Sequence, residues 1–263
     1  MAIDPHSALA GLFVGLLVGL TGIGGGALMT PILVLILGTA PKIAVGTDLF
    51  FAAITKIAGV AIHGQRGTID WQICRRLAAG SLPAALMTGL ALHLFGRNVL
   101  KVDAVIMDGL GYMLALTAVG LMLKTRLHAL GRHLRVEHVE RFKHLQGLLT
   151  VLAGVFLGVV VTLTSIGAGA LGTVMMLYLY PLRLTPSKVV GTDLAHAIPL
   201  ALVAGAGHWM AGNVDYLLLL SLLLGSIPGV LFGSWFSSRA PEGILRFLLA
   251  LLLLATGLKI LLA

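Results

Sequence analysis

Six long apolar segments dominate this chain and fix the medium in which it can fold. They cover 43–62, 77–95, 104–123, 190–208, 214–236 and 243–262. A helix needs about 20 apolar residues to cross the hydrocarbon core of a bilayer. The chain is 58% hydrophobic and only 11% charged, whereas soluble domains carry about 25% charged residues. The pattern excludes a soluble domain and predicts an all-α, multi-pass membrane protein.

Four shorter apolar pieces precede the long segments, two in each half. Pieces 8–20 and 23–38 flank a glycine cluster in the first half, and 148–163 and 167–180 flank a related cluster in the second. Each pair forms either two marginal spans or a hairpin that dips into the membrane, since both fit these lengths. We therefore expect about five helical segments in each half, with short glycine-interrupted segments at the centre.

The two halves are internal repeats. The stretch TGIGGGAL at Thr21–Leu28 aligns with TSIGAGAL at Thr164–Leu171, and VGTDL occurs at Val45–Leu49 and again at Val190–Leu194. Further matches in the same order are His63 with His208, Gly67 with Gly212, Asp70 with Asp215, and GSLP at Gly80–Pro83 with GSIP at Gly225–Pro228. We divide the chain into a first transmembrane repeat (1–123), a basic cytoplasmic loop (124–146) and a second transmembrane repeat (147–263).

Basic residues indicate that the second repeat is inverted relative to the first. Lysine and arginine mark the cytoplasmic side of a membrane protein, and the segment 124–146 carries six of them. With an odd number of crossings in each half, 13 basic residues lie inside and four outside, whereas an even number gives 10 against seven. We therefore predict a bacterial inner-membrane protein with inverted repeats, both termini outside and the central loop in the cytoplasm.

The paired glycine clusters predict a central binding site. Short, glycine-interrupted segments in corresponding positions of two inverted repeats point to the substrate site of a secondary transporter. A broken helix exposes backbone N–H groups that favour anions, and glycine lets the ligand approach the backbone. The alternative is close helix packing through small residues. The candidate substrate-binding residues of the clusters are Thr21, Gly22, Gly24, Gly25, Gly26, Thr164, Ser165, Gly167 and Gly169.

Lys56 is the most informative single residue. It lies inside an apolar segment, where an ionisable side chain costs about 2.5–3.5 kcal/mol and usually faces a cavity or a partner. We expect it to supply a cation for an anionic substrate; snorkelling, or a structural pair with Asp48 two turns earlier, is the alternative. Its repeat equivalent is Ala201, so the site would be asymmetric, with His196 as a further substrate-binding candidate.

Two aspartates and two histidines are candidates for coupling or gating. Asp48 and Asp193 stand in the repeated GTD just before apolar stretches, where aspartate is often a helix N-cap. Capping is the favoured interpretation, and binding of a coupling proton or cation is the alternative. His63 and His208 close the same segments and could titrate near neutral pH, although interfacial packing explains them equally well.

Other functional classes find little support in the sequence. The single cysteine, Cys74, excludes a disulfide framework and a cysteine metal cluster, and the histidines of the central loop lack the three- or four-residue spacing of a helical metal site. The net charge of +8 is spread over the loops, which indicates topology and not nucleic-acid binding. No zinc-protease or serine-nucleophile motif is present, so we expect no enzyme, no cofactor and no metal. An intramembrane aspartyl protease and a purely structural subunit remain as alternatives.

The motifs together resemble the TauE/SafE family of sulfite and organosulfonate exporters. GLTGIGGGALMTPIL, the GTDL stretch and their second copies TSIGAGALGTVMM and VGTDL carry the resemblance, which covers about residues 8–262. It implies a permease for small sulfur-containing anions such as sulfite or sulfonates. In the second copy Ser165 and Ala168 replace glycines, so the site residues do not transfer symmetrically. We expect an exporter that works by alternating access with the anion between the repeats; an anion channel-like pore is the alternative. Small-residue faces would also permit a homodimer.

Overall fold

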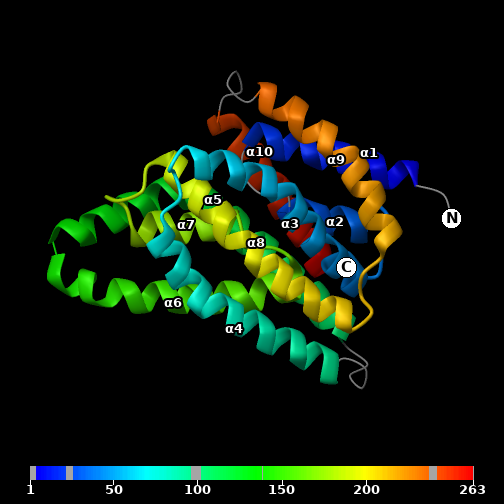
Figure 1. Cartoon of the computed structure of the whole chain (residues 1–263), viewed down its shortest axis with the longest axis horizontal. Coiled ribbons are helices and arrows are strands. Elements are labelled where there is room, and N and C mark those ends of the chain that lie inside the picture. Colours follow the sequence, from blue (N-terminus) through cyan, green and yellow to red (C-terminus); the bar gives the residue numbers. More distant parts are fainter. Residues whose placement is uncertain (1–3, 22–25, 96–101, 138, 237–241, 263) are drawn as a thin grey trace.

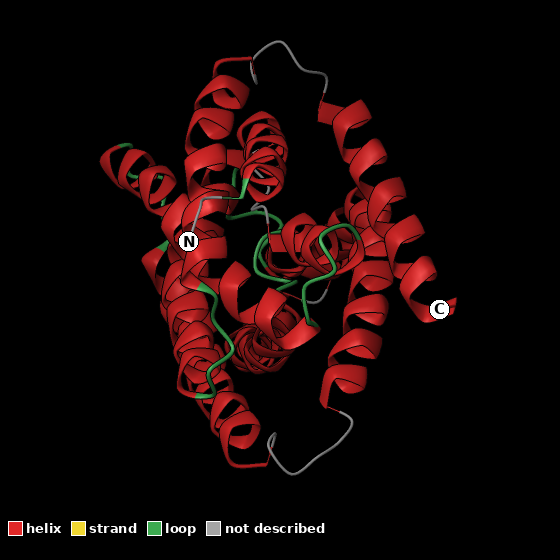
Figure 2. Cartoon of the chain, turned by 90° about the vertical axis from the view of Figure 1, so that its right-hand side faces the viewer, coloured by secondary structure: helices red, strands yellow, loops and turns green. Residues whose placement is uncertain are grey.

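The protein is built from α-helices throughout the part of the chain that the computed structural model describes, residues 4–21, 26–95, 102–137, 139–236 and 242–262 (Figure 2). The first half holds α1 (Pro5–Thr21), α2 (Gly26–Leu35), α3 (Pro41–Gln65), α4 (Trp71–Phe95) and α5 (Val102–Glu137). The second half holds α6 (Val139–Thr164), α7 (Ala170–Leu179), α8 (Pro186–Met210), α9 (Tyr216–Phe236) and α10 (Glu242–Leu262). The all-α prediction is confirmed over these residues.

Among the described residues, seven helices are long and apolar enough to cross a membrane. Their spans are Pro41–Gln65, Trp71–Leu94, Val102–His133, Leu145–Thr164, Pro186–Met210, Tyr216–Gly233 and Gly243–Leu262. All six long segments expected from the sequence are among them. The remaining span lies in α6, so the piece 148–163 belongs to a helix of full crossing length. Large apolar side chains such as Met87 and Trp235 are 70% and 75% exposed, as expected where lipid is the solvent.

Helices α2 and α7 are much shorter than the membrane is thick. Each has 10 residues, which at about 1.5 Å per residue gives about half of the 30 Å hydrocarbon core. Pro31 lies within α2, and α7 begins after the glycine-rich segment that ends α6. The short glycine-interrupted segments expected near the repeat centres are therefore present, and neither of these two helices is long enough to cross.

The segment 124–146 is helical, which differs from the loop that the sequence predicts. Helix α5 continues to Glu137 and α6 begins at Val139, so the two extend beyond the rest of the bundle as a helical hairpin (Figure 1). Arginine, lysine, leucine and glutamate dominate this segment, and all are good helix formers. Gln146 anchors the hairpin to the bundle, because its side-chain amide donates to the Leu179 carbonyl at 2.5 Å. The cytoplasmic location of this segment stays a prediction.

Glycine faces bring two helix pairs into close contact, one pair on each flank of the bundle. On α9, Gly225, Gly229 and Gly233 lie four residues apart and all pack against the backbone of α1. On the other flank, Gly154 and Gly158 of α6 pack against the backbone of α4 in the same way. Small residues at this spacing let membrane helices approach closely. The pairs α1–α9 and α4–α6 thus form the two flanks, with α3 and α8 between them (Figure 1).

The repeated VGTDL motif joins α3 and α8 through reciprocal contacts. The Thr47 hydroxyl accepts a hydrogen bond from the backbone N–H of Asp215 at 3.1 Å, and its repeat equivalent Thr192 accepts one from Asp70 at 2.9 Å. A side chain at Gly46 or Gly191 would collide with the backbone of the partner repeat. The start of each helix therefore lies beside the end of the other, so α3 and α8 pack antiparallel.

Candidate functional site

The candidate site begins at the break between α6 and α7. Ser165 has a positive φ of 59°, and Gly167 and Gly169 have φ values of 120° and 134°. Such values are readily adopted only by glycine, and a non-glycine residue in this region carries strain that often marks function. The break is buried, with Ile166 inaccessible and Ala168 8% exposed. Irregular backbone is thus held inside the protein, as the membrane interior requires.

Lys56 reaches this break from α3. Its side chain is only 4% exposed, and Nζ donates a hydrogen bond to the backbone carbonyl of Ala168 at 3.3 Å. It is therefore fully inside the bundle and does not snorkel to the surface. Asp193 and Asp48 both lie within electrostatic reach of the ammonium group, with Asp193 the stronger partner. Lys56 therefore lies beside the second glycine cluster.

Asp48 and Asp193 are not helix caps, and the favoured sequence interpretation is wrong here. Helix α3 begins at Pro41 and α8 at Pro186, so each aspartate lies about two turns inside its helix. The cap of α8 is Thr185, whose hydroxyl accepts from the Lys188 N–H at 3.4 Å, with proline as the first helical residue. The aspartate side chains are instead directed into the protein, where Asp48 is inaccessible and Asp193 is 4% exposed.

The two aspartates have different neighbours although they are repeat equivalents. Asp48 accepts a hydrogen bond from the Thr30 hydroxyl of α2 at 2.6 Å, and Ser165 lies beside it. Asp193 lies against the first turn of α7, where it interacts with the backbone N–H of Gly169. A Cβ at Gly172 would lie 2.6 Å from the Asp193 carboxylate. The missing side chain of Gly172 is therefore what lets this carboxylate approach α7.

Several polar atoms of this cluster are buried without a hydrogen-bond partner. They are one carboxylate oxygen of Asp48, one of Asp193 and the hydroxyl of Ser165. A buried polar group left unsatisfied costs about 1–3 kcal/mol, so these atoms favour the binding of another species. With Lys56 the cluster holds one ammonium group and two carboxyl groups within the described residues.

His196 joins the cluster, whereas His63 and His208 do not. The His196 side chain is 1% exposed, its Nε2 lies 2.8 Å from the Ser81 hydroxyl of α4, and it is within electrostatic reach of Lys56. His63 pairs with the Thr68 hydroxyl at the end of α3. His208 pairs with the Thr162 carbonyl at the end of α8. The last two histidines thus tie helix ends to neighbouring segments, away from Lys56.

Only part of the first glycine cluster lies within the described residues. Gly22, Gly24 and Gly25 lie outside the described residues, whereas Thr21 ends α1 and Gly26 begins α2. In the second cluster the Thr164 hydroxyl bonds to the Val160 carbonyl of its own helix at 2.8 Å, so its hydroxyl is engaged within α6. The second cluster therefore contributes Ser165, Gly167 and Gly169 to the site.

Three contributing residues were not among the sequence candidates for the site. They are Thr30, Ser81 and Gly172, which contact Asp48, His196 and Asp193 respectively. Thr30 has a repeat equivalent, Thr173, and a hydroxyl inside an apolar run was a signal that could have been used. Gly172 stands where the first repeat has Met29, so that comparison of the repeats would have drawn attention to it.

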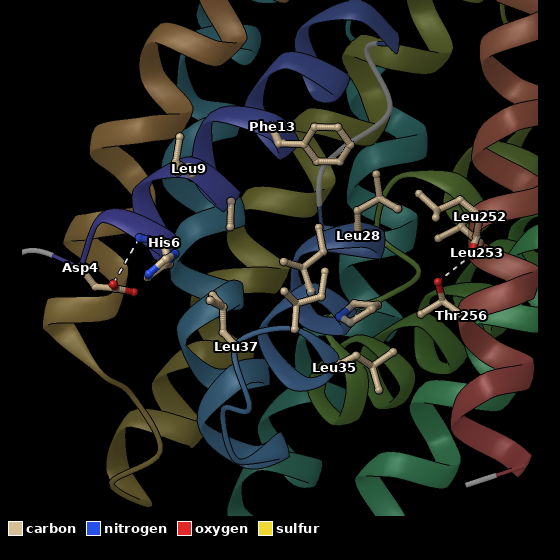
Figure 3. A pocket seen from close by; sticks show the side chains of 14 residues that line it. Asp4, His6, Leu9, Phe13, Leu28, Leu35, Leu37, Leu252, Leu253 and Thr256 are labelled. Atoms are coloured by element: carbon tan, nitrogen blue, oxygen red, sulfur yellow. Dashed lines mark hydrogen bonds between the residues drawn. The ribbon is translucent and has the colours of Figure 1, made fainter.

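A separate apolar cavity of about 770 Å³ lies between α1, α2 and α10. Leu28 and Leu35 of α2 face Leu252 and Leu253 of α10 across it (Figure 3). Asp4 lies at its edge outside the spans, and hydrogen bonds from Ser7 hold the pKa of this carboxyl below its ordinary value of 3.8. The cavity has no lining residue in common with the Lys56 cluster, and its described lining includes no lysine or arginine.

Comparison with known proteins decides the family. The model of the sulfite exporter TauE/SafE family matches residues 7–260, nearly the whole chain. The chain belongs to the TauE/SafE family. The resemblance seen in the glycine clusters and the GTDL motifs is thereby confirmed. No solved structure matches the chain.

Several proteins named as probable membrane transporters match this chain over most of their length. The probable membrane transporter protein YjnA of Bacillus subtilis is 45% identical over 96% of this chain and 97% of its own. The probable membrane transporter protein YdhB of the same organism is 26% identical over 94% and 96%. The probable membrane transporter protein MJ0441 of Methanocaldococcus jannaschii is 26% identical over 80% and 74%. Together with the seven candidate spans, these matches identify a multi-pass membrane transporter.

Proposed function

We propose that this protein is a secondary transporter that exports small sulfur-containing anions, such as sulfite or organosulfonates, across the bacterial inner membrane. The observation that carries this proposal is the position of Lys56, a buried cation at the break that precedes α7. The N-terminus of a helix favours anions, and an ammonium group beside it reinforces that preference. The family is named for sulfite export, and this name supplies the substrate class.

We infer that the anion binds between the two repeats. Lys56 comes from α3 in the first repeat, whereas Ser165, Gly167 and Gly169 belong to the second. His196 of α8 is held by Ser81 of α4, so it too lies where the repeats meet. A site assembled from both repeats changes its exposure when one repeat moves relative to the other, which is the basis of alternating access.

An inverted relation between the repeats is supported by the packing of α3 against α8. These helices are repeat equivalents, both are of membrane-crossing length, and they pack antiparallel through reciprocal contacts of Gly46 and Gly191. Two equivalent spans that run in opposite directions are related by an axis in the membrane plane, as in other inverted-repeat transporters. From the distribution of basic residues we infer that the central hairpin is cytoplasmic and that both termini lie outside.

Alternating access is supported by a difference between the two halves. Helix α7 packs closely along α5, whereas α2 makes few contacts with α10, and the 770 Å³ cavity lies between α2 and α10. The pairs α5–α7 and α10–α2 are equivalent under the repeat. A rocking motion that closes α2 on α10 and separates α7 from α5 would exchange the two arrangements, and this exchange would open the site toward the other side.

Thermal unfolding of the detergent-purified protein tests the proposed substrate class. Sulfite, sulfoacetate, isethionate, thiosulfate, sulfate and acetate are compared, because a ligand that binds only the folded state stabilises it by about 2.7 kcal/mol at 100 times its Kd. We expect a sulfur anion to raise the unfolding temperature of the wild type and not of Lys56→Ala. Flux of that anion in proteoliposomes should saturate and be accelerated by anion on the opposite side. Linear flux would indicate a pore, and no movement through folded protein would refute the transporter.

A further inference from the structure

We propose that the Asp193 carboxylate occupies the substrate position in the empty transporter, and that the substrate anion binds only when Asp193 gives up this position and takes a proton. The inference rests on the proposed function, because it assumes that the anion binds at Lys56. One proton would then bind with each anion, and the two would cross the membrane together.

The surroundings of Asp193 are those of a bound anion. Its carboxylate lies at the N-terminus of α7, where it interacts with the N–H of Gly169 and approaches Gly172. It is also the stronger of the two carboxylate partners of Lys56. A helix N-terminus and an ammonium group are the features that would attract a sulfonate or sulfite. The internal carboxylate and the external anion therefore compete for the same positive groups.

The unsatisfied oxygen of Asp193 is a second, independent observation. Asp193 is 4% exposed, and one carboxylate oxygen has no hydrogen-bond partner. A carboxylate that served only to neutralise Lys56 would be expected to have both oxygens satisfied, because buried charges are stable only when paired and hydrogen-bonded. The free oxygen means that Asp193 has fewer hydrogen bonds to break when it gives up its position.

The charge of the cluster requires a proton when the anion enters. Lys56 can balance one negative charge. If the anion takes that role, Asp193 becomes a buried carboxylate without a counter-charge, which is strongly unfavourable inside a protein. Uptake of a proton by the displaced carboxylate removes its charge and leaves Lys56 and the anion as a neutral pair. Opposite charges favour each other's binding, so proton and anion bind together.

The other titratable groups near Asp193 do not replace it in this role. Helix α3 contributes Lys56, Asp48 and His63 to these groups. Helix α4 contributes the Cys74 thiol, and α8 itself contributes His196. Asp48 is held by the Thr30 hydroxyl at 2.6 Å, and the equivalent of Gly172 in its repeat is Met29, a fully buried side chain. His63 and His196 are bonded to Thr68 and Ser81, and near Asp193 the described parts of α6 and α7 supply hydroxyl and backbone groups.

The pH dependence of anion binding tests the proposal. Isethionate and sulfoacetate are the probes, since a sulfonate stays ionised throughout, and their Kd is measured from roughly pH 6 to 8.5 by thermal shift and by filter binding. If one proton binds with each anion, the wild-type Kd rises by about tenfold for each unit of pH at the alkaline end. We expect Asp193→Asn to bind with a Kd that does not depend on pH and that is lower than that of the wild type at pH 8.5. The matched control is Asp48→Asn, which should keep the wild-type slope.

The outcomes separate this proposal from the proposed function. If Asp193→Asn keeps the wild-type slope, or if Asp48→Asn loses it, the assignment to Asp193 is refuted while anion binding stands. A dependence on Na⁺ in place of pH refutes the proton. If neither probe binds wild type or Asp193→Asn, the substrate class fails, and infrared spectra still test the pairing. In the wild type Asp193 should be ionised, so the wild-type minus Asp193→Asn difference spectrum should show no band of a protonated carboxylic acid. Without Lys56 it should be protonated, so the Lys56→Met minus Lys56→Met/Asp193→Asn difference should show that band. The reverse result overturns the proposal.

Discussion

Lys56 Nζ donates a hydrogen bond to the Ala168 carbonyl at 3.3 Å, across a separation of 112 residues. This contact joins the middle of α3 in one repeat to the break before α7 in the other. It also holds the ammonium group within electrostatic reach of two buried carboxyl groups. The lysine therefore has a structural role, as counter-charge, and a proposed role in binding, and variants can separate the two.

Replacement of Lys56 by methionine should destabilise the protein. The change leaves Asp193 buried without its counter-charge, and removal of one partner from a buried pair typically costs about 3–5 kcal/mol. The double variant Lys56→Met/Asp193→Asn should recover most of this loss, because it removes both charges. Unfolding by denaturant in detergent measures both values. The control Lys259→Met changes an exposed lysine and should stay within about 0.5 kcal/mol of the wild type; equal losses in the single and double variants would contradict the pairing.

Gly172→Ala should impair transport more than stability. The added Cβ would lie 2.6 Å from the Asp193 carboxylate, so the carboxylate must move away from α7 and Lys56. Alanine itself favours a helix over glycine by about 0.5–1 kcal/mol, which offsets part of the cost. We expect proteoliposome flux to fall by at least about tenfold, equivalent to 1.4 kcal/mol, while the unfolding temperature changes little.

Gly120→Ala provides the matched control for Gly172→Ala. Gly120 lies within α5, and a Cβ there would meet only side-chain atoms at 3.6 and 3.8 Å, which is ordinary contact. Flux through this variant should equal that of the wild type, with stability unchanged or slightly higher. A similar loss of flux in both variants would mean that helix stiffness, and not the position of Asp193, limits transport.

The fold was predictable from the sequence because the bilayer imposes simple rules on length and polarity. All six long segments correspond to helices of crossing length, and the lysine inside one of them marked the candidate site. The helical structure of the segment 124–146 could not be predicted in the same way, because a basic, polar sequence is compatible with both a loop and an exposed helix. Its helical hairpin depends on tertiary contacts such as that of Gln146 with the Leu179 carbonyl.

The roles within the GTD motif were the part that sequence reasoning missed. Aspartate after threonine is typical of a helix start, but Pro41 and Pro186 already begin α3 and α8. In the second copy, Gly191 allows the close approach, Thr192 bonds to the partner repeat and Asp193 faces Lys56. Periodicity cannot assign these roles, because they depend on which repeat lies opposite each face of the helix.

Thiol labelling should test the inverted relation of the repeats directly. Arg66 and Ala211 are repeat equivalents in the loops after α3 and α8. In a Cys74→Ala background, single cysteines at these two positions should react with a membrane-impermeant maleimide from opposite sides of oriented vesicles. Inversion predicts that Arg66→Cys is labelled from the cytoplasmic side and Ala211→Cys from outside, in line with the basic residues near Arg66. Labelling of both from one side would mean parallel repeats.

The reciprocal hydrogen bonds of Thr47 and Thr192 lead to a quantitative expectation for stability. Valine has nearly the same shape as threonine but cannot accept the N–H of Asp215 or Asp70. Both threonines are inaccessible, so each substitution leaves a backbone donor without its partner. Side-chain hydrogen bonds in membrane proteins average about 0.6 kcal/mol, and an unsatisfied donor raises the cost toward 1–3 kcal/mol.

We therefore expect Thr47→Val and Thr192→Val to destabilise the protein by similar amounts, about 1–2 kcal/mol each. The two bonds lie at opposite ends of the α3–α8 pair, so the double variant should lose close to the sum of the two values, as distant sites usually do. Denaturant unfolding in detergent measures all three, with Thr256→Val as the control, because the Thr256 hydroxyl bonds to the Leu252 carbonyl within its own helix at 2.7 Å. A large loss of stability on replacing one threonine and none on replacing the other would show that the two equivalent hydrogen bonds contribute unequally to stability. The antiparallel packing of α3 and α8 would then depend mainly on one end of the pair.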